Sequence, residues 1–374
     1  MRRRVFAAIA VTLATAAVPV SAEAGRSTLQ RDADRIVATG VTGVLVRETS
    51  PHRSRTAVSG VRVLGGGAPR TDGRFRIGST NKVLVGTVVL QLVAEGRMRL
   101  DDSVEKWLPG LVRGTGYDGR KITIRHLLQH TAGISDESFP TIETAEQYYA
   151  DRYRVHTEEE IVQAGLRNKP TFQPGKGWDY SNTGYDLIGL MIKAVTGRTW
   201  YDEVHRRIVR PLHLQDTYFP GTAPGINGPH AHGYTRFNPG EYIDTTELVD
   251  ADASGGYIST LKDLDRIVRA IFDGRLLKPA QLRELKSTVP VGSQAEFWPD
   301  AAYGLGVFSR SLPCGGTVWI PSGDQIGYRT RTAVSADGKR SVVVSMSSQL
   351  YDSMEALLAQ EKAASQLIDD VMCR

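Results

Sequence analysis

The chain has 374 residues, of which 41% are hydrophobic and 23% are charged, and its formal net charge is +5 at pH 7. This composition is typical of a globular protein, and a mild, unclustered positive charge gives no reason to expect a nucleic-acid partner. A chain of this length exceeds one ordinary hydrophobic core, so we expect two packed lobes.

The first residues have the pattern of a secretory signal peptide. Arg2-Arg3-Arg4 form a basic start, residues 5–18 are apolar, and Ala22-Glu23-Ala24 is a small-residue cleavage site. The alternative is a membrane anchor, which needs about 20 apolar residues, and Pro19 ends the apolar stretch earlier. We therefore predict removal of residues 1–24, which lowers the net charge to +3. The mature protein is expected to be secreted and extracellular, without a stable membrane anchor.

The next part of the chain predicts a short amphipathic helix and two strands. The helix is expected over residues 28–38, and the strands over 43–49 and 55–64, joined by the turn-prone Ser50-Pro51-His52. An apolar helix follows over residues 81–95 and ends at Gly96. Because it is apolar on most faces, we expect it to be buried.

Ser79 and Lys82, at the start of this buried helix, are candidates for catalysis. An amine three residues after a hydroxyl lies on the same face of a helix, one turn along. A serine is a poor nucleophile until a base removes its proton, and the start of a helix is the positive end of its dipole. The ordinary alternative is a surface lysine near a serine that caps the helix, and the four-residue pattern alone does not decide between the two.

The remaining elements predict an α+β fold. Short helices alternate with Gly- and Pro-marked loops up to about residue 250, and strands dominate the C-terminal part. The clearest helices are 122–130, 158–164, 184–196, 201–209, 260–272, 279–286 and 354–371, and the strands are 303–309, 317–320, 327–334 and 341–347, with a hairpin turn at 336–339.

Strands at both ends with helices between them suggest one lobe built from both termini. We expect an antiparallel sheet flanked by helices from residues 25–78 and 251–374, with an inserted, mostly helical lobe at 79–250. A cleft between two such lobes is the usual place for a site.

Cys314 and Cys373 are the two cysteines of the chain. In an oxidising compartment such a pair indicates one disulfide, which would close a loop of about 60 residues; two buried free thiols are the alternative. The eight histidines show no metal-ligand spacing such as HExxH. We expect no metal and no other cofactor.

Two further motifs complete a family pattern. Tyr180-Ser181-Asn182 follows a tight glycine-rich segment, and Ser322-Gly323 follows a predicted strand that contains Trp319. Together with Ser79-x-x-Lys82, they resemble the serine β-lactamase and penicillin-binding-protein superfamily. The sequence is most similar to the class C β-lactamase-like branch and its secreted actinobacterial D-alanyl-D-alanine carboxypeptidases. Short sequence motifs at residues 127–133, 211–214 and 303–306 also match that branch. The resemblance covers residues 40–373.

The resemblance implies a role for each motif residue. Ser79 would form an acyl-enzyme, Lys82 and Tyr180 would share the proton transfers, and Asn182 would hold Lys82 and the substrate amide. Ser322, Gly323 and Asp324 would line the substrate, and the backbone N–H groups of Ser79 and Asp324 would form the oxyanion hole. The cysteines fall where the secreted carboxypeptidases place their disulfide.

Other interpretations exist for some of these positions. Without the resemblance, Tyr180 and Asn182 would be read as an aromatic core residue and a turn residue. We interpret His130 as structural support under the cleft rather than as the base of a triad.

Three positions depart from the family pattern. Pro321 stands where the family has Lys or His, and proline offers neither a charge nor an N–H. Phe308 stands where the carboxypeptidases have an arginine that binds the terminal carboxylate of the substrate. Asp324 replaces a threonine and is expected to repel a nearby carboxylate, while the candidates to replace the missing cation are Arg310, Arg329 and Arg331. These changes favour an ester, a neutral amide or an unusual peptide over a free C-terminal carboxylate.

We therefore predict a secreted serine acyl hydrolase: a D-alanyl-D-alanine carboxypeptidase-like peptidase, or a related esterase or β-lactamase. Its partner would be a small-molecule or peptide substrate, including peptidoglycan fragments, with no nucleic acid bound, and the protein is expected to be a monomer. The alternatives are a non-catalytic or weakly catalytic penicillin-binding-like module and an acyltransferase of secondary metabolism.

Overall fold

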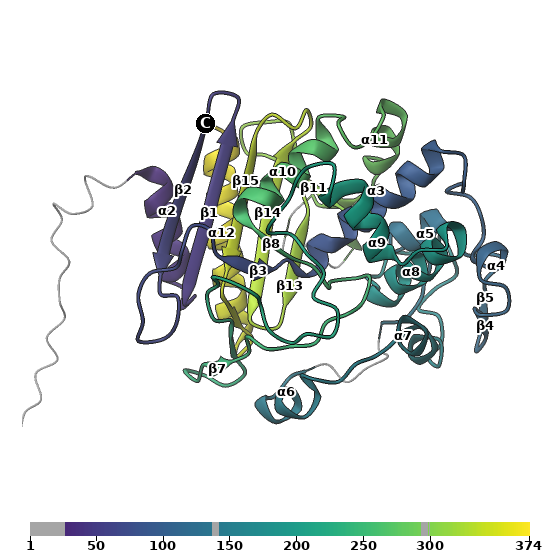
Figure 1. Cartoon of the computed structure of the whole chain (residues 1–374), viewed down its shortest axis with the longest axis horizontal. Helices are drawn as coiled ribbons and strands as arrows, with labels where there is room; N and C mark the ends of the chain where they lie inside the picture. The colour runs from purple at the N-terminus through teal and green to yellow at the C-terminus, as the bar shows by residue number, and fades with distance from the viewer. Residues whose placement is uncertain (1–26, 137–141, 293–297, 299) are drawn as a thin grey trace, which may run out of the picture.

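The computed structural model describes residues 27–136, 142–292, 298 and 300–374 of the chain (Figure 1). The predicted signal peptide, residues 1–24, lies outside the described residues. Helices pack on both faces of a nine-stranded antiparallel sheet, and a mostly helical region extends from one side of it. This arrangement confirms the predicted α+β fold; the division of the chain at residues 79 and 250 stays a prediction.

Strands from the two ends of the chain pair in the large sheet. β1 (Gly43–Ser50) lies between β2 (Arg53–Gly60) and β15 (Ser341–Met346), as the neighbouring purple and yellow ribbons of Figure 1 show. The sheet continues through β14 (Tyr328–Ser335), β12 (Thr317–Ile320), β11 (Phe308–Ser311), β10 (Ala302–Tyr303) and β9 (Val289–Pro290). β13 (Ser322–Gln325) pairs with the start of β14, off this path.

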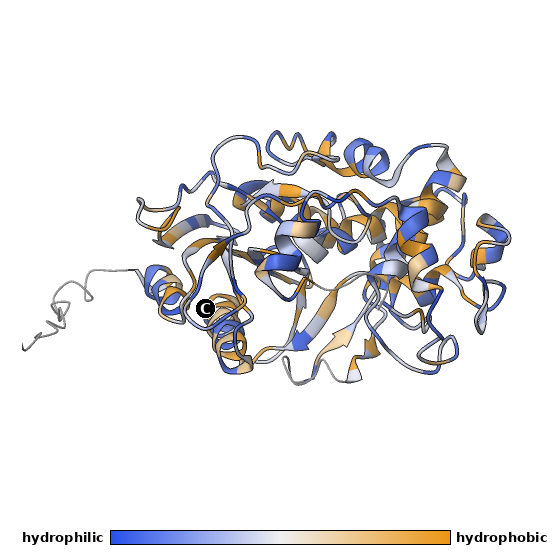
Figure 2. Cartoon of the chain, turned by 90° about the horizontal axis from the view of Figure 1, so that it is seen from below, coloured by the Kyte–Doolittle hydropathy of each residue, from blue (hydrophilic) through white to orange (hydrophobic). Residues whose placement is uncertain are grey.

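Both faces of this sheet are buried because its side chains alternate between two cores. Val44 and Val46 of β1 face a core formed with α2 (Thr28–Val37) and α12 (Met354–Met372). Leu45, between them, belongs to the second core, to which α10 (Leu261–Phe272) and α3 (Asn81–Ala94) contribute. Figure 2 shows the hydrophobic residues along the strands and the inner helices, while the outer loops are mainly hydrophilic.

The helix that follows Ser79 is the centre of the second core. Eleven residues of α3 are buried, including Val83, Leu84 and Val88, which confirms the prediction of a buried helix. It packs against α8 (Asn182–Thr196), α9 (Trp200–Val204) and α11 (Pro279–Leu285). The other helices are α4 (Val104–Trp107), α5 (Ile124–Leu128), α6 (Ala145–Asp151), α7 (Glu158–Gly165) and a π-helical turn at His205–Val209.

Several short strands were not predicted, because two or three residues carry no periodicity that a sequence can reveal. β3 (Arg74–Arg76) pairs with β8 (Ile258–Thr260), and β6 (Tyr234–Arg236) lies between β16 (Ser348–Leu350) and β7 (Ile243–Asp244). β4 (Arg113–Gly114) and β5 (Tyr117–Asp118) form a separate small hairpin.

The prediction of one strand over residues 303–309 is wrong. The segment is a hairpin of β10 and β11, in which the Gly304 N–H donates to the Val307 carbonyl at 2.8 Å. Gly306 has φ +96°, and a Cβ there would lie 2.7 Å from the Lys82 carbonyl oxygen. This turn therefore needs glycine for its conformation and for its close approach to α3.

Among the described residues, none of the helices combines the length and the apolar character needed to cross a bilayer.

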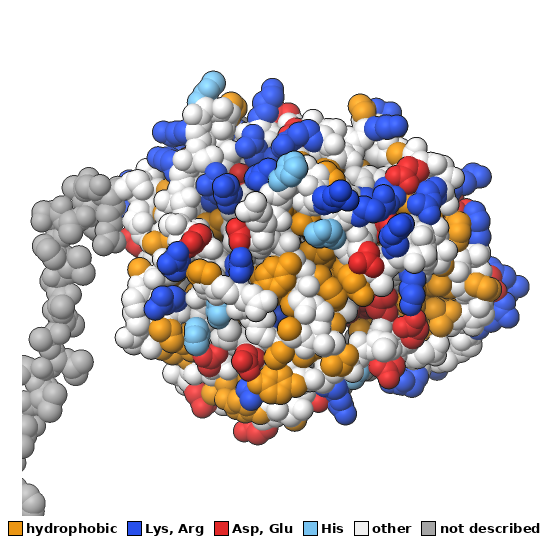
Figure 3. Space-filling view, in the orientation of Figure 1, with side chains coloured by type: hydrophobic (Ala, Val, Ile, Leu, Met, Phe, Trp, Pro, Cys, Tyr) orange, Lys and Arg blue, Asp and Glu red, His pale blue; other side chains and the backbone are white. Residues whose placement is uncertain are grey.

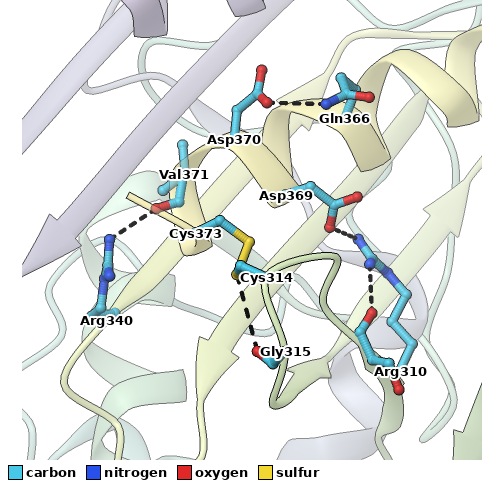
Figure 4. Close-up of a disulfide and its surroundings, with 10 residues drawn as sticks. Arg310, Cys314, Gly315, Arg340, Gln366, Asp369, Asp370, Val371 and Cys373 are labelled. Carbon is cyan, nitrogen blue, oxygen red and sulfur yellow. Dashed lines mark hydrogen bonds and ion pairs between the residues drawn. A yellow bond between two sulfur atoms is a disulfide. The ribbon is translucent and has the colours of Figure 1, made fainter.

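A disulfide joins the loop between β11 and β12 to the end of α12 (Figure 4). Cys314 and Cys373 are 59 positions apart in the chain and their Cα atoms are 5.8 Å apart, which confirms the predicted pairing. Nearby, the Arg340 guanidinium donates to the Val371 carbonyl at 3.0 Å, so a second contact fixes the same end of α12.

We predict that the Cys314→Ser/Cys373→Ser variant unfolds several degrees below the native protein. Opening a loop of this length increases the entropy of the unfolded chain, which corresponds to about 4 kcal/mol in the chain-entropy model. Thermal unfolding followed by circular dichroism checks this, and the native protein measured with a reductant is the control. Equal unfolding temperatures for the variant and the oxidised native protein would contradict the prediction.

Candidate active site

Ser79 and Lys82 meet at the start of α3. Ser79 lies in a 3-10 turn, Gly78–Thr80, that leads directly into the helix, so Lys82 is one turn further along the same face. The Lys82 ammonium Nζ is 3.0 Å from the Ser79 hydroxyl Oγ. Lys82 is only 1% exposed, so the ordinary alternative of a surface lysine does not apply.

Three oxygen atoms surround the Lys82 ammonium. Besides Ser79, Nζ donates to the Asn182 side-chain oxygen at 2.6 Å and to the Ser254 carbonyl at 3.1 Å. These acceptors match the three N–H donors of a charged ammonium. In the neutral amine, the nitrogen would instead accept a hydrogen bond from the Ser79 hydroxyl, while Asn182 and Ser254 keep it in place.

Tyr180 lies against Lys82 and beside Ser79. Its ring centroid is 4.8 Å from Lys82 Nζ, and it lines a cavity of about 310 Å³ together with Ser79. The structure therefore brings the phenol to the same site as the hydroxyl and the amine, with its ring as the contact to Lys82.

Asp136 orients Asn182, and the sequence analysis missed it. The Asn182 side-chain nitrogen donates to Asp136 at 2.8 Å, which turns the amide oxygen toward Lys82. The second Asp136 oxygen accepts from the Thr183 N–H at 2.9 Å, at the start of α8. Asp136 is 46 positions from Asn182 in the chain, so no local sequence motif indicates that the two side chains are in contact.

His130 supports the Tyr180 segment from below. Its ring is buried, its centroid is 4.3 Å from that of Tyr180, and its Nδ1 accepts from the Ser181 N–H at 3.1 Å. Burial, with a smaller contribution from the Lys82 charge, lowers the pKa of His130 well below its usual value, so the imidazole is neutral. These contacts agree with a structural role.

The backbones of Ser79 and Asp324 lie side by side because both segments contain glycine. A Cβ at Gly323 of β13 would lie 2.7 Å from the Ser79 nitrogen, and a Cβ at Gly78 would lie 2.6 Å from the Asp324 carbonyl oxygen. No other residue type fits at either position without a shift of the backbone. This close approach places two backbone segments beside the Ser79 hydroxyl, where an oxyanion hole needs its N–H donors.

The cavity that contains Tyr180 has largely apolar walls. We call it the Tyr180 cavity, and it is lined by Ser79, Tyr180, Trp298, Phe308, Ser322, Gly323, Asp324, Arg329, Arg331, Tyr351, Leu357 and Glu361. Phe308 forms part of its wall, at the position where the family resemblance implies a carboxylate-binding arginine.

The charged residues of the Tyr180 cavity neutralise one another. Arg331 donates to Asp324 at 2.6 Å and to Glu361 at 2.8 Å. Arg329 also pairs with Asp324, at 3.1 Å, and with Glu361, at 3.0 Å. Burial raises the pKa of Asp324, but the two arginines outweigh it and hold that pKa well below its usual range. Two cations and two anions thus form one compensated group.

The pairing of these four charges contradicts two expectations from the sequence. The predicted repulsion by Asp324 is wrong because the two arginines compensate its charge. Arg329 and Arg331 are also not free to replace the missing family arginine. Arg310 pairs with Asp369 at 2.7 Å beside the disulfide, as Figure 4 shows, and does not line the Tyr180 cavity.

A second cavity, of about 420 Å³, is also lined by Ser79. We call it the Asn182 cavity, because Asn182 lines it and Tyr180 does not. Several carboxylates lie in its wall. Burial, followed by the charge of Asp252, raises the pKa of Asp250 to about 7. Burial also raises the pKa of Asp186 well above its usual value.

We predict that the protein becomes less stable as the pH rises through the neutral range. A carboxyl with a raised pKa keeps a proton in the folded state that the unfolded chain has released, so the free energy of unfolding falls between about pH 4 and the folded pKa. The Asp250→Asn variant has no carboxyl at this position, so its folded state does not hold this proton. Its unfolding temperature should exceed that of the native protein at pH 8 and approach it at pH 4, and parallel curves for the two proteins would contradict this.

Three comparisons place these features among known proteins. A family model described as Beta-lactamase matches residues 28–367. A D-stereospecific amidohydrolase from Streptomyces sp. has 35% sequence identity and a TM-score of 0.80, over 89% of this chain and 97% of that one. A D-amino acid amidase from Ochrobactrum anthropi SV3 has 25% identity and a TM-score of 0.76, over 92% of this chain and all of that one.

Among curated relatives, penicillin-binding protein 4* from Bacillus subtilis is 26% identical over 290 residues. The match covers 73% of this chain and 60% of the relative, so the chain spans less than two thirds of that protein.

Proposed function

We propose that this chain, which belongs to the Beta-lactamase family, hydrolyses neutral amides or esters through an acyl-enzyme on Ser79. One observation carries the proposal: Lys82 Nζ lies 3.0 Å from the Ser79 hydroxyl, at the junction of two cavities. A nucleophile with a base in hydrogen-bond reach, held in turn by a third group, is the arrangement that acyl transfer needs.

The proposed reaction begins from the neutral Lys82 amine, which takes the proton of the Ser79 hydroxyl. The serine oxygen attacks the carbonyl carbon, and the N–H groups of Ser79 and Asp324 stabilise the negative charge that develops on the carbonyl oxygen. Asn182 keeps Lys82 in place through the 2.6 Å bond and contacts the substrate amide. Lys82 returns the Ser79 proton through Tyr180 to the leaving amine or alcohol as its bond to the carbonyl carbon breaks. Water then attacks the ester of Ser79 and gives a proton to the same pair, which passes it to the Ser79 oxygen as the acid is released.

The Tyr180 cavity favours an uncharged leaving group. Its proton donor is Tyr180, so the leaving group departs on this side of Ser79. Phe308 and Trp298 line the cavity, and its two arginines are already paired with Asp324 and Glu361. A free carboxylate would be desolvated here without a cation of its own, which is unfavourable.

The relatives support the same substrate class. The two similar solved structures are described as a D-stereospecific amidohydrolase and a D-amino acid amidase. We therefore include an amide of a D-amino acid in the proposal. Secretion, action on peptidoglycan fragments, D-alanyl-D-alanine carboxypeptidase activity and a monomeric state stay predictions.

A panel of substrates tests this proposal. It should contain D-alanine p-nitroanilide, D-phenylalanine amide, a p-nitrophenyl ester, a D-alanyl-D-alanine peptide and nitrocefin, each also incubated with the Ser79→Ala variant. We expect hydrolysis of the amides and the ester, and a kcat/KM at least about 100-fold lower for the peptide with a free carboxylate. Equal rates on that peptide, or unchanged rates in Ser79→Ala, would contradict the proposal.

We predict that Pro321→His raises kcat/KM on D-alanyl-D-alanine esters by about tenfold. In the family pattern this position carries Lys or His, a hydrogen-bonding group that proline cannot supply, and the next residue, Ser322, lines the Tyr180 cavity. Pro239→His, in an exposed turn, is the matched control and should change nothing. An unchanged rate in folded Pro321→His would show that another residue already fills this role.

A further inference from the structure

The Asn182 cavity has more carboxylates than its cations neutralise. Six aspartates line it: Asp136, Asp151, Asp186, Asp250, Asp252 and Asp324. Two of these pair with cations, because Asp151 pairs with Arg154 at 3.1 Å and Asp324 pairs with two arginines. Both oxygens of Asp136 accept hydrogen bonds, from Asn182 and Thr183. Asp186, Asp250 and Asp252 accept hydrogen bonds from uncharged groups, and in the described part of the chain no ion pair involves any of them.

One oxygen of Asp186 has no partner although it is buried. The side chain is 0% exposed, and its Oδ1 accepts from the Ala253 N–H at 3.1 Å. Its Oδ2 makes no hydrogen bond with any described residue, and Asp186 lines the cavity. A buried polar atom without a partner is unfavourable and rare in folded proteins. This oxygen is therefore available to a ligand.

The two neighbouring carboxylates also have accepting capacity left. Asp252 accepts from the N–H groups of Ser254 and Gly255 at 2.7 and 3.2 Å, and Asp250 accepts from the Gln325 side chain. An ionised carboxylate can accept about four hydrogen bonds, so each retains free lone pairs.

Burial raises the pKa of Asp250 and the charges of Arg76 and Lys82 oppose this shift, but the hydrogen bonds of both cations go to other groups. Lys82 is held by Ser79, Asn182 and Ser254, and Arg76 donates to the carbonyl groups of Pro224 and Thr246. Burial raises the pKa of Glu158 to about 8, so this neighbouring carboxyl adds negative charge beside Asp186 only above that pH. Figure 3 shows acidic side chains over α7, whose first turn contains three glutamates. The surroundings therefore attract a cation toward the cavity.

We propose that Asp186, Asp250 and Asp252 bind a primary ammonium group on the acyl part of the substrate. The inference rests on the proposed function, because the leaving group departs through the Tyr180 cavity and the acyl part must then occupy the Asn182 cavity. An ammonium offers three N–H donors to the free oxygens of three carboxylates.

Proton release accompanies this binding. In the absence of a cation, burial and mutual repulsion raise the pKa of Asp250 to about 7 and keep protons on the cluster. An ammonium favours the ionised carboxylates, so it displaces these protons. Affinity for the cation is thus expected to increase with pH up to about the pKa of the cluster, provided the ligand amine is itself protonated.

A matched pair of substrates tests the proposal: D-alanine p-nitroanilide, which has a free amine, and its N-acetyl derivative, which is neutral. We expect kcat/KM of the native protein to be about 10- to 100-fold higher on the free amine. Asp250→Asn and Asp252→Asn should lower that ratio about tenfold or more. Asp101→Asn, which replaces a largely exposed aspartate, is the control.

Two results would overturn the proposal. One is equal rates of the native protein on both substrates, and the other is a parallel loss on both substrates in the aspartate variants, which would indicate a purely structural role.

A binding measurement separates this inference from the proposed function. Calorimetry of D-phenylalanine amide with Ser79→Ala, in two buffers of different ionisation enthalpy, should show proton release near pH 7 that Asp250→Asn reduces. If the native protein hydrolyses neither substrate, the proposed function fails, and this titration still decides whether the cluster binds an ammonium. Binding that neither releases protons nor depends on Asp250 or Asp252 would overturn the inference.

Discussion

Replacing Lys82 with alanine is expected to lower the rate of Ser79 acylation about 10³-fold or more. In the proposed reaction Lys82 is the base: its Nζ contacts the Ser79 hydroxyl at 3.0 Å, and Asn182 and Ser254 fix its position. Without an acceptor for its proton, the serine remains a poor nucleophile. The burst of p-nitrophenol from an activated ester, followed by stopped flow, measures acylation directly.

A second variant separates chemistry from packing. Lys82→Met keeps most of the buried volume and removes the amine, so it should be as slow as Lys82→Ala but more stable. Lys193→Ala, at an exposed position of α8, is the control and should acylate normally. A native burst rate in folded Lys82→Ala would transfer the role of the base to another group, such as Tyr180.

Replacing Glu361 with alanine is expected to destabilise the protein by about 3–5 kcal/mol. Glu361 accepts from Arg329 at 3.0 Å, from Arg331 at 2.8 Å and from the Trp298 indole at 2.8 Å. Its removal leaves two buried arginines with Asp324 as their remaining acidic partner. Urea unfolding followed by fluorescence measures the change in the free energy of unfolding.

A balanced replacement should restore much of this loss. The double variant Arg331→Met/Glu361→Met removes one cation and one anion, so Arg329 and Asp324 remain as a pair. Replacing a buried ion pair with apolar residues is often close to neutral. Glu355→Ala, at an exposed position of α12, is the control and should change stability by less than about 1 kcal/mol. If Glu361→Ala is as stable as that control, the charge compensation described for the Tyr180 cavity is not important for folding.

The sequence was sufficient for those features that depend on local spacing. Ser79 and Lys82 are three positions apart on one helix, so their contact follows from helix geometry once the helix is identified. The burial of α3 follows from its uninterrupted apolar residues. The order of elements also indicated that strands from both termini form one sheet.

Features that depend on tertiary contacts were not predictable in the same way. Asp136 orients Asn182 from 46 positions away, and Glu361 reaches Arg331 from 30 positions away. The sequence placed Arg329 and Arg331 in a predicted strand, but their charge compensation depends on α12, which contacts that strand. The hairpin at residues 303–309 was missed because its short strands look like one alternating segment.

Labelling with a fluorophosphonate tests the central claim most directly, namely that Ser79 is an activated nucleophile. The account predicts that intact-protein mass spectrometry shows one added phosphonyl group, that peptide mapping places it on Ser79, and that Ser79→Ala and Lys82→Met remain unlabelled. Absence of label on the folded native protein, or a label on another residue while hydrolysis continues, would contradict it.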